Sequence, residues 1–178
     1  MKKTLWLLCA AVITSCLFAA CDESSEAGEY ADWRNRNQRF IDSIAAVAEE
    51  NIDGNWRIYK SFTLPADNPN DLGLVKDVND YVYCHIEQRG TGTESPIFTD
   101  SIRANYRVWL INDVLIDQSF RGEFNPDISV PGKFAMNSTI VGWTTALQQM
   151  HVGDSWTIYI PYSMGYGERE SGIIPGYS

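Results

Sequence analysis

The segment of residues 134–178 constrains the fold of this chain more than any other part. Trp143 and the apolar residues after it recur at helical spacing, which predicts a short helix over 144–150 with the tryptophan at its start and facing inward. Residues 156–160 alternate between apolar and polar and end at a proline, which predicts a half-buried strand. Glycine-bounded loops then carry a tyrosine and two isoleucines. In this order, the elements predict a cup of apolar side chains.

The order of these motifs resembles the FKBP-type peptidyl-prolyl cis-trans isomerases. The pieces that meet the family pattern in sequence are Ile140 with Gly142 and Trp143, Gln149-Met150, Val152-Gly153, Pro161, Tyr166-Gly167 and Gly172-Ile173-Ile174-Pro175. The resemblance implies an α+β fold in which an antiparallel sheet wraps around one short helix. It also implies prolyl isomerase activity on proline-containing polypeptides, with no cofactor.

The resemblance further implies which residues line a proline-binding site. Trp143 would form its floor, and the Ile140 N–H and the Tyr166 hydroxyl would donate hydrogen bonds to substrate carbonyls. Asp117 would supply a carboxylate at the rim, and Tyr106 would form a wall. These five are the expected catalytic residues. The expected substrate-binding residues are Ile116, Phe134, Ile173 and Ile174, the last of which would close the side of the cup.

The chain departs from the family pattern at two places near the rim. Ile116 precedes Asp117 where the family usually has phenylalanine, so one aromatic wall becomes aliphatic. The loop 118–133 is longer than usual, and Phe120 or Phe124 would have to enter the site to supply a second aromatic wall. These departures leave an alternative open, a non-catalytic binding module that keeps the cup for proline-containing segments.

The sequence offers no metal site and no nucleophilic machinery. Its two histidines, His85 and His151, fall on a predicted strand and beside a predicted turn, and no spacing of cysteines or carboxylates around them is typical of a metal site. Both histidines are therefore interpreted as structural. Prolyl isomerisation needs no such groups, because its barrier of about 18–20 kcal/mol comes from the amide resonance that is lost on twisting.

Residues 1–20 predict a secretory signal peptide. Lys2 and Lys3 precede an apolar run that is too short to remain as a membrane span, and small residues then lead to Cys21. This end resembles a bacterial lipobox, which implies that Cys21 is lipidated and becomes the mature N-terminus; a conventional signal cleaved elsewhere is the alternative. The acidic residues 21–31 predict a tether to the membrane. The implied location is the bacterial cell envelope, on its periplasmic side or at the cell surface.

Cysteine usage and charge limit the remaining chemistry. After processing at Cys21 only Cys84 would remain, and its place in an alternating run predicts a buried thiol in a strand rather than a reactive one. The formal net charge is −9, from 14 basic and 23 acidic residues. Nucleic acid is therefore not an expected partner.

Residues 32–53 predict an amphipathic helix in front of the main domain. Apolar residues recur at steps of three and four between Asp32 and Glu50, and Asp53-Gly54 ends the pattern. The apolar face of this helix is expected to pack on its own domain. The alternative is self-association, or contact with another partner, through the helix of residues 32–50.

The main domain is expected over residues 54–178. Strands are predicted at 56–62, 80–88 and 102–111, and antiparallel strands followed by one short helix argue for the α+β class. The family continues past its Gly-Ile-Ile-Pro loop into a final strand that this sequence does not contain. We therefore expect a C-terminally incomplete domain, in which the place beside the 156–160 strand is empty or is filled by an early strand.

Overall fold

The computed structural model describes residues 28–66 and 77–178. The chain divides into two compact units, residues 1–31 and 32–178, and the helices and strands below belong to the second. The expected signal peptide, Cys21 and most of the acidic tether lie outside the described residues. The elements are α2 (Trp33–Glu50), β1 (Trp56–Lys60), β2 (Tyr81–Gln88), β3 (Ser101–Ala104), β4 (Arg107–Trp109), β5 (Leu115–Gln118), β6 (Gly132–Ala135), α3 (Val141–Leu147) and β7 (Ser155–Tyr159), with 3₁₀ turns at Val78–Asp80, Met136–Ser138 and Tyr162–Met164.

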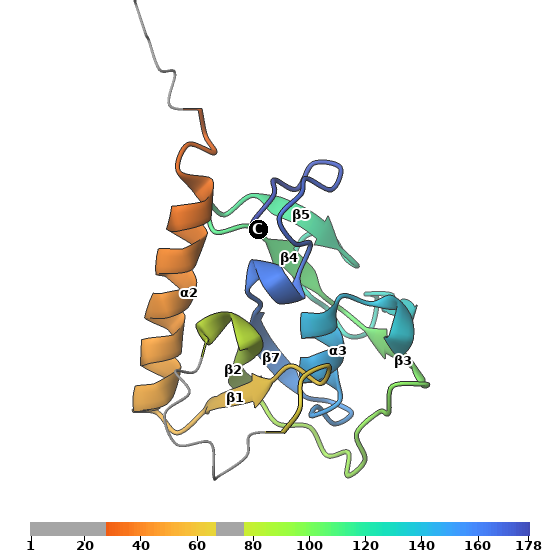
Figure 1. Cartoon of the computed structure of the whole chain (residues 1–178). Coiled ribbons are helices and arrows are strands. Elements are labelled where there is room, and N and C mark those ends of the chain that lie inside the picture. The colour runs from red at the N-terminus through yellow and green to blue at the C-terminus, as the bar shows by residue number, and fades with distance from the viewer. Residues whose placement is uncertain (1–27, 67–76) are drawn as a thin grey trace, which may run out of the picture. The chain divides into compact units, whose positions relative to one another are not determined.

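The central sheet has the strand order β1-β2-β7, and both pairings are antiparallel. Its middle strand, β2, is buried on both faces, because successive side chains of a strand point to opposite sides. The Tyr83 ring faces α2, with Tyr81 in the same buried cluster, whereas Val82 and Cys84 pack with Ala146 of α3. The two helices therefore lie on opposite faces of this sheet (Figure 1). This arrangement confirms the α+β class predicted from the sequence.

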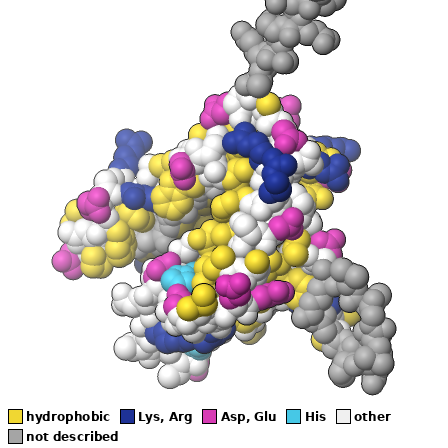
Figure 2. Space-filling model, turned by 90° about the vertical axis from the view of Figure 1, so that its left-hand side faces the viewer, with side chains coloured by type: hydrophobic (Ala, Val, Ile, Leu, Met, Phe, Trp, Pro, Cys, Tyr) yellow, Lys and Arg dark blue, Asp and Glu magenta, His cyan; other side chains and the backbone are white. Residues whose placement is uncertain are grey.

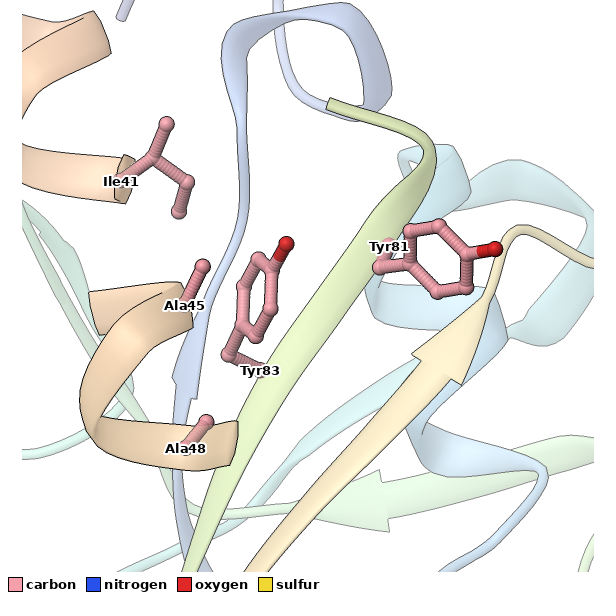
Figure 3. Close-up of a cluster of buried hydrophobic side chains, with 5 residues drawn as sticks. All are labelled: Ile41, Ala45, Ala48, Tyr81 and Tyr83. Carbon is pink, nitrogen blue, oxygen red and sulfur yellow. The ribbon is translucent and has the colours of Figure 1, made fainter. Parts of the chain in front are cut away.

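Helix α2 packs its apolar face on its own domain. Ile41, Ala45 and Ala48 are buried against the tyrosines of β2, and Figure 3 shows the ring of Tyr83 facing these helix residues. The helix ends at Glu50 because Asn51 adopts a left-handed conformation, with φ of 45°, and returns its N–H to Val47 O. The expected helix is confirmed, with its last turn slightly shorter than the sequence indicated.

The outer face of α2 carries a mixture of side chains. Figure 2 views this side of the domain, and hydrophobic side chains are visible there between acidic and basic ones. The large apolar residues of α2 that stay exposed are Phe40, at 37%, and Val47, at 48%. Self-association through this helix remains a prediction.

Helix α3 begins earlier than the sequence predicted. It runs from Val141 to Leu147, with Ile140 in extended conformation before it, so Trp143 lies within the first turn, at the helix start as expected. The first turn of α3 packs closely on Ile160 because residue 142 is a glycine. A Cβ at that position would lie 2.4 Å from the Cγ2 of Ile160. Only glycine lets the first turn approach the chain after β7 so closely.

The single strand expected at 102–111 is two strands in the structure. β3 pairs with β6, whereas β4 pairs with β5, and the chain changes partner at Asn105 and Tyr106. The reason is a local pair of hydrogen bonds to Ser119. The Tyr106 N–H donates to Ser119 Oγ at 2.9 Å, and the Ser119 N–H donates to Tyr106 O at 3.0 Å. Ser119 thus takes the backbone groups that a continuous ladder would have used.

β7 pairs with β2 along one edge, and no strand in residues 28–66 or 77–178 pairs with its other edge. The early strand β1 pairs instead with the other edge of β2, where Arg57 lies opposite Cys84. Cys84 is fully buried and free, and burial raises the pKa of its thiol to about 12. The expected buried, unreactive cysteine is therefore found.

Candidate active site

Three aromatic rings from three different elements meet at the start of α3. Tyr106 comes from the junction of β3 and β4, Phe134 from β6 and Trp143 from α3. The Tyr106 ring centre lies 5.0 Å from that of Trp143 and 5.4 Å from that of Phe134, and 5.4 Å separates the other two. The rings meet edge to face at 69° to 88°, the geometry in which aromatic edges and faces attract each other.

The three rings are half-buried, so the cluster is an apolar surface that opens to the outside. Gly132 makes room for it. A Cβ at Gly132 would lie 2.7 Å from Cζ of Phe134 and 3.4 Å from Cε1 of Tyr106. The absence of a side chain at this position therefore lets Phe134 lie beside Tyr106. The structure thus brings together three residues that the sequence analysis expected in the cup, Trp143, Tyr106 and Phe134. Their roles in binding stay a prediction.

The Tyr106 hydroxyl forms a polar edge beside the three rings. It donates a hydrogen bond of 2.9 Å to Oδ2 of Asp117, which lies exposed on β5. Burial, together with this bond and the negative charge of Asp117, raises the pKa of Tyr106 to about 12. The hydroxyl therefore stays protonated at neutral pH. Asp117 keeps its second oxygen, Oδ1, bonded to the N–H of Gln118 at 2.8 Å.

Tyr166 lies on the loop after the last 3₁₀ turn and is 38% exposed. Burial of the remaining part of the ring, and then the charge of Asp117, raise the pKa of its hydroxyl. Tyr166 also contributes to the raised pKa of Tyr106. The two hydroxyls and the carboxylate therefore act on one another electrostatically, and both hydroxyls remain donors at neutral pH.

Ile140 stands immediately before α3 in an extended conformation, with φ −60° and ψ 151°. Its carbonyl accepts the N–H of Thr144 at 3.1 Å, which is the first bond of the helix. No hydrogen bond within residues 28–66 and 77–178 uses the Ile140 N–H. The first N–H groups of a helix lack partners inside it, so this donor is available to an incoming carbonyl.

The aliphatic residues expected to close the cup divide into two groups. Ile173 is 72% exposed at the tip of a turn. Ile174, by contrast, is buried against Trp33 and Leu110, and the half-buried Ile116 packs on the same cluster. Ser171 and Ile174 close a tight turn with Ile173 at its tip. Ile173 therefore points to solvent, and Ile174 packs against Trp33 of α2.

The long loop after β5 forms its own aromatic pair. The rings of Phe120 and Phe124 lie 5.2 Å apart, and the guanidinium of Arg107 lies 4.4 Å from the centre of the Phe120 ring. Phe120 also lines a shallow hollow formed by residues 115–121, which includes Asp117 but none of the three clustered rings. The ring that neighbours Tyr106 and Trp143 is that of Phe134, on β6.

The histidines of the described chain lie away from this cup. His85 is held between two carboxylates, with Nε2 at 2.7 Å from Asp53 Oδ2 and Nδ1 at 2.9 Å from Glu87 Oε1. His151 lies beside a turn, 3.7 Å from Asp154. Within residues 28–66 and 77–178 no group of three or more histidine, cysteine or carboxylate side chains has the arrangement of a metal site.

Sequence reasoning missed two residues of this site. Ser119 fixes the backbone of Tyr106, and Gly132 accommodates Phe134. A serine in a polar loop and a glycine next to a predicted strand carry no local signal of such roles, because both act on residues far away in the sequence.

Residues 92–178 match the family model of the FKBP-type peptidyl-prolyl cis-trans isomerases. This part of the chain belongs to that family. The match covers the FKBP-type domain from the loop before β3 through the aromatic cluster to residue 178. The family resemblance inferred from the sequence is therefore confirmed.

Two curated relatives carry the same family name. The chain is 36% identical over 109 residues to the peptidyl-prolyl cis-trans isomerase Mip of Coxiella burnetii, covering 60% of this chain and 44% of that protein. It is 40% identical over 85 residues to an FKBP-type 22 kDa isomerase of Escherichia coli, covering 47% and 38%. The chain thus spans less than half the length of these relatives.

The solved structures support the fold. A peptidyl-prolyl cis-trans isomerase from Pseudomonas syringae superposes with a TM-score of 0.55 at 20% identity, covering 84% of this chain and 87% of that one. At this identity the likeness concerns the fold alone. It confirms the expected FKBP-like architecture with a helix in front of the domain.

Proposed function

We propose that the FKBP-type domain is a peptidyl-prolyl cis-trans isomerase that binds proline-containing segments in the cup of Tyr106, Phe134 and Trp143. The observation that carries the proposal is the edge-to-face cluster of these rings, at 5.0 Å to 5.4 Å, next to the hydrogen-bonded Tyr106–Asp117 pair. The family names of the relatives support isomerisation over binding alone.

The cup supplies what non-covalent isomerisation requires. A planar amide has more charge separation than the twisted transition state, so an apolar surface that excludes water disfavours the planar form. The rings of Trp143 and Phe134 provide such a surface for the proline ring. Lowering the barrier by about 8 kcal/mol would accelerate the reaction roughly a millionfold.

The polar groups at the rim orient the substrate. The Ile140 N–H and the Tyr166 hydroxyl donate to the carbonyls on either side of the prolyl bond, and Asp117 acts through Tyr106. Donors that are fixed before the substrate arrives stabilise the twisted form without reorganising during the reaction. No cofactor, metal or nucleophile takes part in this mechanism.

The test is a prolyl isomerisation assay on protein that starts after Cys21, with peptides that have Leu or Phe before proline. Uncatalysed relaxation takes tens of seconds at 25 °C, so acceleration is easy to measure. Folded protein that binds the peptide without accelerating relaxation at micromolar concentration would contradict the proposal and favour the binding module. The variant Trp143→Ala serves as the inactive control.

We further propose that the protein acts in the bacterial envelope, held to a membrane through lipidated Cys21. The sequence pattern of residues 1–21 supports this location, as do the names of relatives such as the outer membrane protein MIP of Legionella longbeachae. None of the helices in the described ranges is long and apolar enough to cross a bilayer. The expected substrates are exported polypeptides with prolines in accessible segments.

A further inference from the structure

The first turn of α2 holds the segment 174–178 through two neighbouring side chains. Nε1 of Trp33 donates to Ser178 Oγ at 2.8 Å, and the Trp33 ring is 6% exposed among Leu110 and Ile174. The guanidinium of Arg34 lies 4.7 Å from the centre of the Tyr177 ring. The helix therefore contacts this segment with one buried ring and one cation.

The same segment is bonded to the loop that carries Tyr166. The Tyr177 N–H donates to the carbonyl of Gly167 at 2.8 Å, and the Tyr177 ring lies 5.1 Å from that of Tyr162. Gly167 directly follows Tyr166 in the chain. A displacement of Tyr177 would therefore shift the backbone next to the Tyr166 hydroxyl.

The Trp33 cluster also contacts the turn that presents Ile173 and the strand that carries Asp117. Ile174 and Ser171 exchange hydrogen bonds of 2.9 Å and 3.1 Å, which close the tight turn that presents Ile173. Ile116, the residue before Asp117, packs on the same cluster. One buried ring on α2 thus lies behind both the loop with Tyr166 and the strand with the rim carboxylate.

We propose that Trp33 is a positioning residue for the isomerase site, holding the loop of residues 165–178 so that Tyr166 and Ile173 stay beside the cup. The proposal rests on the proposed function. Trp33 does not touch the cup itself and acts through Ile174, the segment after it and Ile116. Helix α2 is then part of the frame of the site as well as a cover for the sheet.

Loss of this contact has a specific kinetic consequence. Ile173 is 72% and Tyr166 38% exposed, and the turn hydrogen bonds and the Trp33 cluster hold the backbone that carries them. A misplacement of about 1 Å far from the chemistry can cost up to roughly a hundredfold in rate. Because Ile173 would contact the bound substrate and Tyr166 would also stabilise the twisted form, the loss is expected in both KM and kcat.

The experiment compares three variants of the full chain. Trp33→Ala removes the contact, Trp33→Phe keeps most of the ring but not the Nε1 donor, and Ile41→Ala removes a buried side chain further along α2, against Tyr81 and Tyr83. Assays are run at a temperature at which melting curves show every variant folded. We expect kcat/KM to fall about tenfold in Trp33→Ala, to recover partly in Trp33→Phe, and to stay within about twofold in Ile41→Ala.

Hydrogen exchange separates this role from general destabilisation. In Trp33→Ala the amides of residues 165–178 should exchange faster, whereas Ile41→Ala should affect β2. The proposal is overturned if both alanine variants lose equal activity, or if Trp33→Ala leaves KM and the exchange of that segment unchanged. A wild-type chain without isomerase activity would refute the proposed function, and the exchange of residues 165–178 together with proline-peptide affinity would still decide whether Trp33 holds the loop.

Discussion

The Tyr106 hydroxyl donates a hydrogen bond of 2.9 Å to Oδ2 of Asp117, across the boundary between β4 and β5. This pair joins the apolar floor of the cup to its polar rim. The bond fixes the Tyr106 ring against Trp143 and leaves the carboxylate exposed beside the entrance. Removing either partner therefore tests how the rim contributes to catalysis.

Asp117→Asn should lower kcat/KM about tenfold, or about 1.4 kcal/mol of transition-state stabilisation, while leaving the fold nearly intact. Asn keeps an acceptor for Tyr106 but removes the negative charge. Steady-state isomerisation assays and thermal melting measure the two effects. Tyr106→Phe is the matched variant, because it removes the hydroxyl and keeps the ring. An unchanged rate in Asp117→Asn would mean that the carboxylate only holds Tyr106.

Trp143→Ala should abolish activity and lower the free energy of unfolding by about 2–3 kcal/mol. Full burial of a tryptophan would give about 3–5 kcal/mol, and the partly buried ring of Trp143 gives less. Urea titrations of both proteins measure the difference. Trp143→Phe should keep part of the activity, since a smaller ring still contacts Tyr106 and Phe134. Full activity in the alanine variant would exclude this cluster as the site.

The rate should not fall between pH 7 and about 10 through ionisation of Tyr106. Burial and the bond to Asp117 raise the pKa of this hydroxyl to about 12, so the donor form persists far above neutral pH. A pH profile of kcat/KM at constant ionic strength checks this. Tyr106→Phe should give the same flat profile at a lower rate. A decline in the wild type near pH 10 that disappears in Tyr106→Phe would contradict the assignment.

His85 should make stability depend on pH in two directions. The hydrogen bonds to Glu87 and then Asp53 raise the pKa of His85 above its ordinary 6.5, so its contribution is complete below 6.5 and is lost as pH rises through the folded-state value. The bond from the Asn55 N–H and then the bond to His85 lower the pKa of Asp53 below its ordinary 3.8, and the bonds to His85 and then Thr157 lower that of Glu87 below 4.5. The contribution of these carboxylates is complete above their ordinary values and is lost as pH falls through the lowered folded-state values. The network therefore stabilises most between pH 4.5 and 6.5.

Thermal melting across pH 4–9 tests this network against His85→Asn. The melting temperature of the wild type should exceed that of the variant most in the window between pH 4.5 and 6.5, and the difference should shrink toward alkaline pH. Thr157, which donates to Glu87 at 2.8 Å, should remain bonded in both proteins. A melting-temperature difference between the two proteins that grows above pH 8 would contradict the expected direction of the pH dependence.

Cys21→Ser should release the protein from the membrane fraction. Lipidation at Cys21 is the anchor proposed here. No helix in residues 28–66 and 77–178 is long and apolar enough to hold the serine variant in a bilayer. Fractionation of cells followed by a high-salt wash measures the distribution. A serine variant that stays in the washed membranes would argue against the lipid anchor.

Sequence alone determined the elements whose signals are local. The helix Trp33–Glu50 follows from apolar steps of three and four residues, and the buried thiol of Cys84 follows from strand alternation. Both inferences hold because helix periodicity and strand alternation involve residues close together in the chain. The ordered family motif predicted Tyr106 and Trp143 as cup residues; the structure brings their rings together, and their role in catalysis stays a prediction.

Tertiary structure decided what depends on contacts between distant residues. The strand expected at 102–111 splits because Ser119 takes the backbone groups of Tyr106, and Ile174 turns toward Trp33 rather than toward the cup. Sequence periodicity gives the face on which a side chain lies but not the element that it meets. The partner across the fold is set by how whole elements pack, so these contacts could be known only once the chain was folded.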